Sequence, residues 1–263
     1  IYKEYEMKKY ILDLTVKAVE RINGKYVLVR LTSDSLLPDM HPGQFVEVRV
    51  DNTSETYLRR PISINFVDRD ANELWLLVAV VGDGTRHISE VQPGQTLNCV
   101  LPLGNGFTMP HTTSECVLLV GGGVGVAPLL YMGAEMHNRG CEPTFLLGAR
   151  RVADLLELDL FGKYGRVCVT TEDGSYGERG FVTNHSVLAE HFDRVVTCGP
   201  TPMMKAVARH AHNAGIDCEV SLENMMACGI GVCLCCVEKT VMGNLRVCKE
   251  GPVFNIKKLL WQL

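Results

Sequence analysis

The chain has 263 residues, of which 46% are hydrophobic and 21% are charged, and its formal net charge is −4. This length exceeds one typical domain, so we expect two domains with a small appendage. The slight negative charge gives no reason to expect nucleic acid or an anionic membrane surface as a partner. No apolar stretch approaches the roughly 20 residues of a membrane span, and the first residues lack the apolar run of a secretory signal. We therefore expect a cytoplasmic protein.

Residues 1–110 are predicted to form a small antiparallel β-barrel. Short runs with strand character recur at 10–19, 26–32, 44–50, 61–67, 74–80 and 96–100. Turn signals such as Asn23-Gly24 and Pro93-Gly94 separate them. Regular short strands with little helix are typical of such a barrel, and one or two helical turns fit 85–91.

Residues 111–221 show a different pattern, which predicts a parallel α/β domain. An apolar run at 116–120 leads into a glycine loop and a helical stretch at 127–138. Strand-like runs at 144–147, 166–170, 194–197 and 217–221 then alternate with helix-sized segments. Residues 222–252 are rich in glycine and cysteine with little periodicity, so 222–263 are predicted to form a separate metal-binding lobe.

Six of the eleven cysteines are scattered singly, whereas five lie between 228 and 248. The scattered ones are interpreted as small buried hydrophobic residues, and they are Cys99, Cys116, Cys141, Cys168, Cys198 and Cys218. A disulfide scaffold is not expected, because the chain is large and shows no export signal. Clustered cysteines in a reducing compartment indicate a metal instead.

The clustered cysteines have the C-x4-C-x2-C spacing, with one remote partner, of plant-type [2Fe–2S] ligation. The predicted ligands are Cys228, Cys233, Cys236 and Cys248. A structural zinc site is the alternative, although zinc knuckles favour paired C-x2-C arms. The spacing selects Cys236 over its neighbour Cys235, which is left as a packing residue or spare thiol.

The segment Arg60-Pro61-Ile62-Ser63 starts a predicted strand, and 82–85 follow some twenty residues later as Gly-Asp-Gly-Thr. Glycines there would let backbone amides approach a pyrophosphate at the start of a short helix. Arg60 would supply a charge-assisted contact to the same phosphates. Taken alone, the first segment indicates a solvated arginine beside an edge-strand proline, and the second segment adds weight to the phosphate site.

A glycine loop follows the apolar run at 116–120 and opens a helix, which is the context of a dinucleotide phosphate site. Its glycines are Gly121, Gly122, Gly123 and Gly125. Val126 stands where G-x-G-x-x-G has its third glycine, so a tight turn without ligand is the alternative. Cys198 ends a later strand, where it is either a nicotinamide-facing thiol or a buried cysteine.

In combination, RPIS (60–63), GDGT (82–85), GGGVGVAP (121–128) and CGP (198–200) resemble the ferredoxin–NADP⁺ reductase superfamily. That superfamily pairs an FAD-binding antiparallel barrel with an NAD(P)-binding α/β domain. The tail SLENMMACGIGVCLCCV (221–237) with VCKEGPVF (247–254) resembles the electron-transfer subunits of B-type, NAD⁺-dependent dihydroorotate dehydrogenases. The resemblance covers essentially the whole chain.

The resemblance implies three cofactor sites. FAD would be held by Arg60, Pro61, Ile62 and Ser63, by Leu77, Val78 and Ala79 along its ribityl–adenine part, and by Gly84 and Thr85 at its pyrophosphate. The four predicted cysteine ligands would hold the [2Fe–2S] cluster. NAD would bind at the glycine loop and the Cys198 turn. Glu172 and Asp173 would meet the adenosine ribose or disfavour a 2′-phosphate, with a solvated acidic turn as the alternative.

The resemblance also implies an oxidoreductase function in pyrimidine biosynthesis. A partner subunit carrying FMN would oxidise dihydroorotate to orotate, and electrons would pass through the cluster and FAD to NAD⁺. The assembly would be a heterotetramer with two of each subunit, and no catalytic residue for dihydroorotate is expected in this chain. Met225, Met226 and Ile230 are candidates for interface, cluster shielding or plain packing. The alternatives are a related reductase subunit serving ferredoxin, sulfide or hydrogenase chemistry, and a zinc-stabilised binding module.

Overall fold

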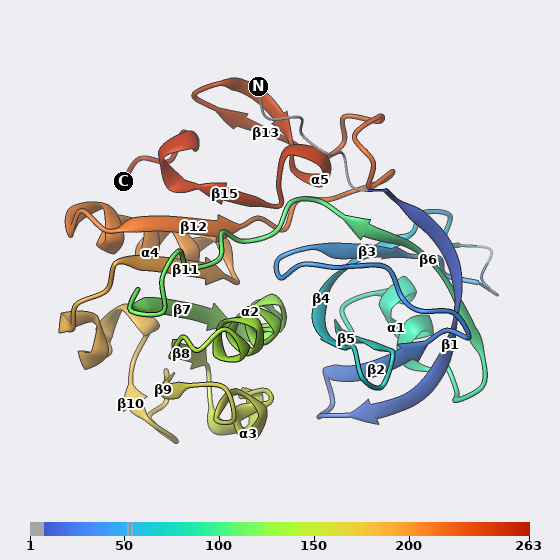
Figure 1. Cartoon of the computed structure of the whole chain (residues 1–263), viewed down its shortest axis with the longest axis horizontal. Helices are drawn as coiled ribbons and strands as arrows, with labels where there is room; N and C mark the ends of the chain where they lie inside the picture. Colours follow the sequence, from blue (N-terminus) through green and yellow to red (C-terminus); the bar gives the residue numbers. More distant parts are fainter. Residues whose placement is uncertain (1–7, 52, 54) are drawn as a thin grey trace.

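A computed structural model describes residues 8–51, 53 and 55–263 of the chain. Six antiparallel strands close into a barrel in the order β1-β2-β5-β4-β3-β6, on one side of the molecule (Figure 1). The strands are β1 (Tyr10–Arg21), β2 (Tyr26–Thr32), β3 (Phe45–Val48), β4 (Arg60–Asp68), β5 (Glu73–Ala79) and β6 (Thr96–Leu103). Along β1, buried Leu14 and Val16 alternate with exposed Asp13 and Thr15, the period expected of a barrel wall. Helix α1 (Asp83–Ser89) follows β5 and places Ile88 in the barrel core.

The second half of the chain forms a seven-stranded sheet in the order β10-β9-β8-β7-β11-β12-β15. Six of its strands run parallel, and they are β7 (Val117–Gly122), β8 (Thr144–Ala149), β9 (Arg166–Thr171), β10 (Glu178–Arg179), β11 (Arg194–Cys198) and β12 (Asp217–Ser221). Every residue of β7 and β11 is buried, as expected for central strands covered on both faces. The predicted barrel and parallel domain are thus confirmed.

Helices cover the sheet and connect it to the barrel. They are α2 (Ala127–Asn138), α3 (Leu158–Phe161) and α4 (Thr201–Asn213), with the 3₁₀ helices η1 (Gly123–Val126), η2 (Val152–Asp154), η3 (Val182–Asn184) and η4 (Ser186–Ala189). Helix α2 lies between the sheet and the barrel (Figure 1). Its Tyr131 hydroxyl donates a hydrogen bond to the Met40 carbonyl at 3.0 Å, which joins α2 to the barrel core. Within the described part of the chain, none of the helices has the length and apolarity needed for a bilayer crossing.

The C-terminal segment contains more regular structure than its sequence indicated. It forms the hairpin β13 (Val237–Thr240) and β14 (Gly243–Arg246), then α5 (Val247–Glu250), β15 (Val253–Asn255) and η5 (Ile256–Lys258). Strand β15 pairs antiparallel with β12, so this segment is attached to the edge of the parallel sheet.

The scattered cysteines follow the prediction with one correction. Five of them are buried, but Cys116 is exposed because it lies one residue before β7. Its backbone N–H donates to the Asp193 carboxylate at 2.8 Å.

Candidate functional site

The first two predicted cluster ligands share one tight loop. Gly229 and Gly231 have φ angles of +65° and +84°, in the left-handed region that glycine adopts without strain. This curvature turns the N–H groups of Val232 and Cys233 toward the Cys228 sulfur, at 3.3 and 3.5 Å. Burial raises the pKa of the Cys228 thiol, but donation from the Cys233, Ile230 and Val232 amides outweighs it and lowers the pKa to about 6. The loop therefore stabilises a thiolate, the form that binds iron.

The other two ligands form a second, buried pair. The N–H of Cys248, in α5, donates to the Cys236 sulfur at 3.3 Å, and Val247 N–H donates to the Cys236 carbonyl at 3.1 Å. Burial, a hydrogen bond with Cys236 and the charges of Cys236 and Cys228 raise the pKa of Cys248 to about 12, so both sulfurs lie within electrostatic reach of Cys248. Cys235 is exposed, whereas Cys236 has only 2% of its surface accessible.

The arrangement of the thiols fits a two-iron cluster. Among the described residues, no three His, Cys, Asp or Glu side chains surround a position for a single metal ion. The thiols are grouped as Cys228 with Cys233 and Cys236 with Cys248, and a [2Fe–2S] cluster needs one pair of thiolates for each iron.

A cavity of about 270 Å³ lies where the barrel, the glycine loop and the segment before the cysteines meet. Predicted FAD residues line it, namely Pro61, Ile62, Ser63, Leu77, Ala79 and Thr85. Val124 of the glycine loop and Ser221–Met226 complete the wall. The side chain of Val78 lies instead in the barrel core, so this residue faces a ligand only through its backbone.

Arg60 and the start of α1 are in direct contact beside this cavity. A Cβ atom on Gly84 would lie 2.4 Å from Arg60 Nε, so a larger residue there would push the guanidinium out of its present position. The Thr85 hydroxyl accepts hydrogen bonds from the N–H groups of Val81 and Gly82, at 3.0 and 3.1 Å. A cationic side chain thus lies beside the first turn of α1, as an FAD pyrophosphate site requires.

A second cavity, of about 660 Å³, lies over the carboxyl ends of the parallel strands. Gly122 and Gly123 line it, but the other two loop glycines serve packing. A Cβ atom on Gly125 would lie 2.4 Å from the Gly199 Cα atom, and one on Gly121 would lie 2.9 Å from Leu129 Cδ1. Gly125 and Gly121 therefore let the loop pack against the Cys198 turn and α2.

The two acidic residues of the 171–174 turn differ in position. Glu172 lines the second cavity, as a ribose-binding residue would. The Asp173 carboxylate instead accepts hydrogen bonds from the N–H and hydroxyl groups of Ser175, at 2.9 and 2.6 Å, which also lower its pKa.

Three residues around these cavities were missed by the sequence reasoning. Glu223 lines the first cavity, and its Oε1 lies 4.0 Å from the sulfur of the fully buried Cys198. Burial, followed by the Glu223 charge, raises the pKa of Cys198 well above its usual value. Lys25 and Tyr26, from the barrel, line the second cavity. No motif marks these positions, because they depend on contacts between distant segments.

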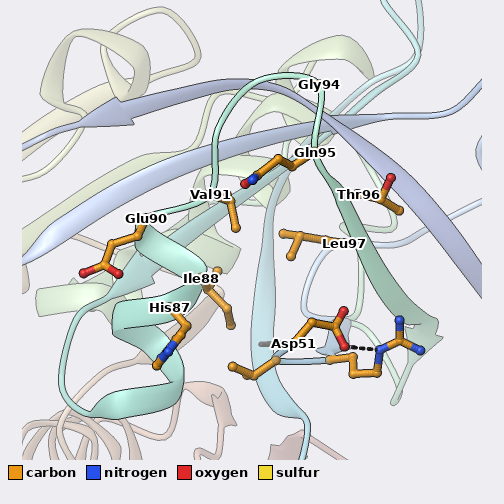
Figure 2. Close-up of a pocket in the computed structure, with 11 residues that line it drawn as sticks. Asp51, His87, Ile88, Glu90, Val91, Gly94, Gln95, Thr96 and Leu97 are labelled. Carbon is orange, nitrogen blue, oxygen red and sulfur yellow. Dashed lines mark hydrogen bonds and ion pairs between the residues drawn. The ribbon is translucent and has the colours of Figure 1, made fainter. Parts of the chain in front are cut away.

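A third cavity, of about 460 Å³, lies between α1, the start of β6 and residues 49–51 (Figure 2). Ile88, Val91 and Leu97 give it apolar walls, and an Arg49–Asp51 ion pair of 2.7 Å borders it. None of the predicted cofactor residues lines this cavity.

Comparison with known proteins identifies the family. Residues 223–260 match the iron–sulfur cluster binding domain of dihydroorotate dehydrogenase B, and residues 119–209 match an oxidoreductase NAD-binding domain. The chain is 40% identical over 252 residues to a dihydroorotate dehydrogenase B (NAD⁺) electron transfer subunit from Fusobacterium nucleatum, covering 93% of this chain and 96% of the relative. It is also 40% identical to the Desulforamulus reducens subunit of that name, covering 96% and 99%. The chain belongs to this family of electron transfer subunits.

Solved structures agree with this family assignment. An NADH-dependent reduced ferredoxin–NADP oxidoreductase, studied for flavin-based electron bifurcation, superposes with a TM-score of 0.84 at 30% identity, covering 94% of this chain and 90% of that one. A ferredoxin reductase of carbazole 1,9a-dioxygenase shares the fold at 19% identity, with a TM-score of 0.67 over 80% of this chain and 68% of that one. The predictions of an NAD-dependent oxidoreductase component with FAD, a [2Fe–2S] cluster and NAD are thereby confirmed, and the zinc alternative is disfavoured.

Proposed function

We propose that this chain carries electrons from a partner FMN subunit, which oxidises dihydroorotate to orotate in pyrimidine biosynthesis, to NAD⁺. The proposal rests on one observation, which is that the three sites adjoin one another. The segment Ser221–Met226 lines the first cavity and leads directly to Cys228, while the glycine loop contributes Val124 to the first cavity and Gly123 to the second. Cluster, flavin and nucleotide would therefore lie in that order along one route.

All predicted site residues except Cys198, which is fully buried, have a role in this proposal. Cys228 with Cys233 and Cys236 with Cys248 hold the cluster. Arg60, Gly84 and Thr85 bind the FAD pyrophosphate, while Pro61–Ser63 and Leu77–Ala79 position the rest of the cofactor. Gly122 and Gly123 bind NAD, with Gly121 and Gly125 fixing the loop. When bound, FAD takes up electrons singly and delivers a hydride to NAD⁺.

The partner subunit docks, in this proposal, on exposed apolar side chains around the cysteine loop. These are Met225, Ile230, Val232 and Leu234, and their exposed fractions range from 44% to 84%. Exposed apolar side chains grouped around a functional loop are typical of a protein interface. Met226 differs, because it is half-buried and packs against the core.

The assembly is a heterotetramer of two subunits of each kind in the cytoplasm. Among the described residues no two of the eleven cysteines form a disulfide, as is usual in a reducing compartment. Within this chain, 1–110 form the FAD-binding barrel, 111–221 the NAD-binding domain and 222–263 the cluster-binding lobe.

The test is anaerobic co-purification with an FMN-containing dihydroorotate dehydrogenase subunit, followed by an assay of NADH formation from dihydroorotate and NAD⁺. We expect a stable complex, flavin and iron–sulfur absorption, and activity that the FMN subunit alone lacks. The control is the Cys248→Ser subunit, which should lose the activity with NAD⁺. A complex that oxidises NADH but never uses dihydroorotate would overturn the proposal.

A second candidate is a reductase subunit acting on ferredoxin, favoured by the likeness to the ferredoxin–NADP oxidoreductase structure at 30% identity. Reduced ferredoxin offered to the same complex distinguishes the two. Electron transfer from ferredoxin to NAD⁺, without any from dihydroorotate, would support this alternative.

A further inference from the structure

The hairpin between β1 and β2 extends from the barrel to the nucleotide cavity of the other domain. The Asn23 side chain shapes its turn by accepting hydrogen bonds from the N–H groups of Lys25 and Tyr26, at 2.9 and 3.2 Å. The Asn23 amide also donates to the Ala153 carbonyl at 3.2 Å, and Lys25 Nζ lies 3.4 Å from Asp154 Oδ1. The hairpin is therefore attached to the parallel domain at η2.

Tyr26 faces the glycine loop from this hairpin. Its ring packs against the hydrophobic cluster that includes Val126 and Ala127. Its hydroxyl lies 3.7 Å from the position of a Cβ atom on Gly123, a residue with a φ of +56°. Among the residues that the structure describes, none accepts a hydrogen bond from this hydroxyl or donates one to it. An unpartnered phenol thus lines the cavity at the point where the loop turns into η1 and α2.

The charges around the phenol favour a neutral hydroxyl that donates a hydrogen bond. Burial and the Asp154 carboxylate raise the pKa of Tyr26, and Arg150 lowers it less. The cations Lys25 and Arg150 and the carboxylates of Asp154 and Glu172 also line the cavity, and Lys25 is paired with Asp154. Arg150 is therefore the cation left to face a ligand, and a glycine turn faced by a hydroxyl donor and this cation suits a diphosphate.

We propose that the Tyr26 hydroxyl binds the diphosphate of NAD opposite the glycine turn, so that the nucleotide site includes a residue of the FAD barrel. This inference rests on the proposed binding of NAD at Gly122 and Gly123 and extends it to the other domain. The dinucleotide would then be held between two domains, which orients it relative to the flavin cavity.

The test is Tyr26→Phe, which removes the hydroxyl and keeps the packed ring. A hydrogen bond to a charged group changes affinity by about tenfold or more. We therefore expect the Kd for NAD⁺, measured by titration calorimetry on the FAD- and cluster-loaded chain, to rise roughly tenfold. In stopped-flow reduction by NADH, the half-saturating NADH concentration should rise similarly, while the limiting rate changes less than about twofold. Adenosine, which lacks both phosphates, should bind both proteins with nearly equal Kd.

The matched control is Tyr176→Phe, which removes an exposed phenol that does not line the cavity and should bind NAD⁺ as the wild type does. If Tyr26→Phe keeps its FAD and binds NAD⁺ within about twofold of the wild type, the inference is wrong while the proposed function stands. Equal weakening of adenosine and NAD⁺ would also overturn it, because the hydroxyl would then act outside the diphosphate. A loaded wild-type chain that binds no NAD⁺ would overturn both.

Discussion

Asn65 and Glu157 form a buried contact between the barrel and the parallel domain. Asn65 lies in β4 and is fully buried, and Glu157 precedes α3 with a φ of +55°. The Asn65 amide donates to Glu157 Oε1 at 2.9 Å. The remaining oxygens, Asn65 Oδ1 and Glu157 Oε2, are buried and have no hydrogen-bond partner among the described residues. A proton on Oε2 would let the carboxyl group donate to Oδ1 and satisfy both.

The pKa of Glu157 agrees with such a proton. Burial raises it most, the Asn65 hydrogen bond lowers it and the Glu20 charge raises it, with a result of about 7 against an ordinary value of 4.5. The folded state therefore holds this proton more tightly than the unfolded state. The stability contributed by the group is fully present below about pH 4.5 and is lost as pH rises through about 7. A shift of roughly 2.5 units corresponds to about 3 kcal/mol.

Glu157→Gln is predicted to remove this loss, because glutamine is neutral at every pH and its amide can donate to Asn65 Oδ1. The free energy of unfolding of the variant should lie within about 1 kcal/mol of wild type at pH 5 and exceed it by up to about 3 kcal/mol at pH 8. Urea unfolding of the cofactor-loaded chain, followed by far-ultraviolet circular dichroism at both pH values, measures the difference. Exposed Glu142→Gln is the control and should give no pH-dependent gain. A destabilised Glu157→Gln at pH 8, or an equal difference at both pH values, would refute the reasoning.

The remaining predictions concern the cofactor sites. Cys236→Ser should lose most of the bound iron and Cys235→Ser should retain it, because Cys236 is the buried partner of the remote ligand. Iron content per chain measures the difference, and the reverse result would make Cys235 the ligand. Gly84→Ala should weaken FAD retention by roughly tenfold, because its Cβ atom would displace Arg60. Flavin absorbance after dialysis measures the retention, and unchanged retention would show that Arg60 does not bind the pyrophosphate. Glu172→Ala should raise the ratio of kcat/KM for NADPH to kcat/KM for NADH by roughly tenfold, because it removes a negative charge from the cavity. An unchanged ratio would show that the carboxylate is a solvated surface group.

Local patterns in the sequence were sufficient for the barrel and the parallel sheet. The alternation in β1 and the apolar run of β7 are properties of short segments, and their prediction needs no knowledge of distant contacts. The hairpin of β13 and β14 has exposed or half-buried residues at most positions, so its strands show no clear period. Strand β15 has three residues, which is too short for any periodic signal.

Functional residues were predicted only where they belong to a recognisable sequence motif. The cysteine spacing indicates the cluster ligands because the ligands themselves are conspicuous residues. Glu223 and Tyr26 carry no such signal, since each reaches its cavity through the packing of one domain on another. Gly125 shows the opposite error. It belongs to a recognisable motif and was predicted to bind the cofactor, but its role is close packing against Gly199.

The pairing of β12 with β15 explains how a ligand twelve residues beyond Cys236 reaches the same site. Ser221 at the end of β12 lies opposite Val253 at the start of β15. The point where the chain leaves the sheet toward the cysteine loop therefore lies beside the point where it re-enters the sheet after Cys248. The loop is fixed on its other side by the barrel, where a Cβ atom on Gly229 would lie 2.6 Å from Glu47 Cγ in β3. The loop packs on β3, and β3 pairs with β4, which carries Pro61–Ser63. Rigid elements of both domains therefore determine the distance between the cluster and the flavin.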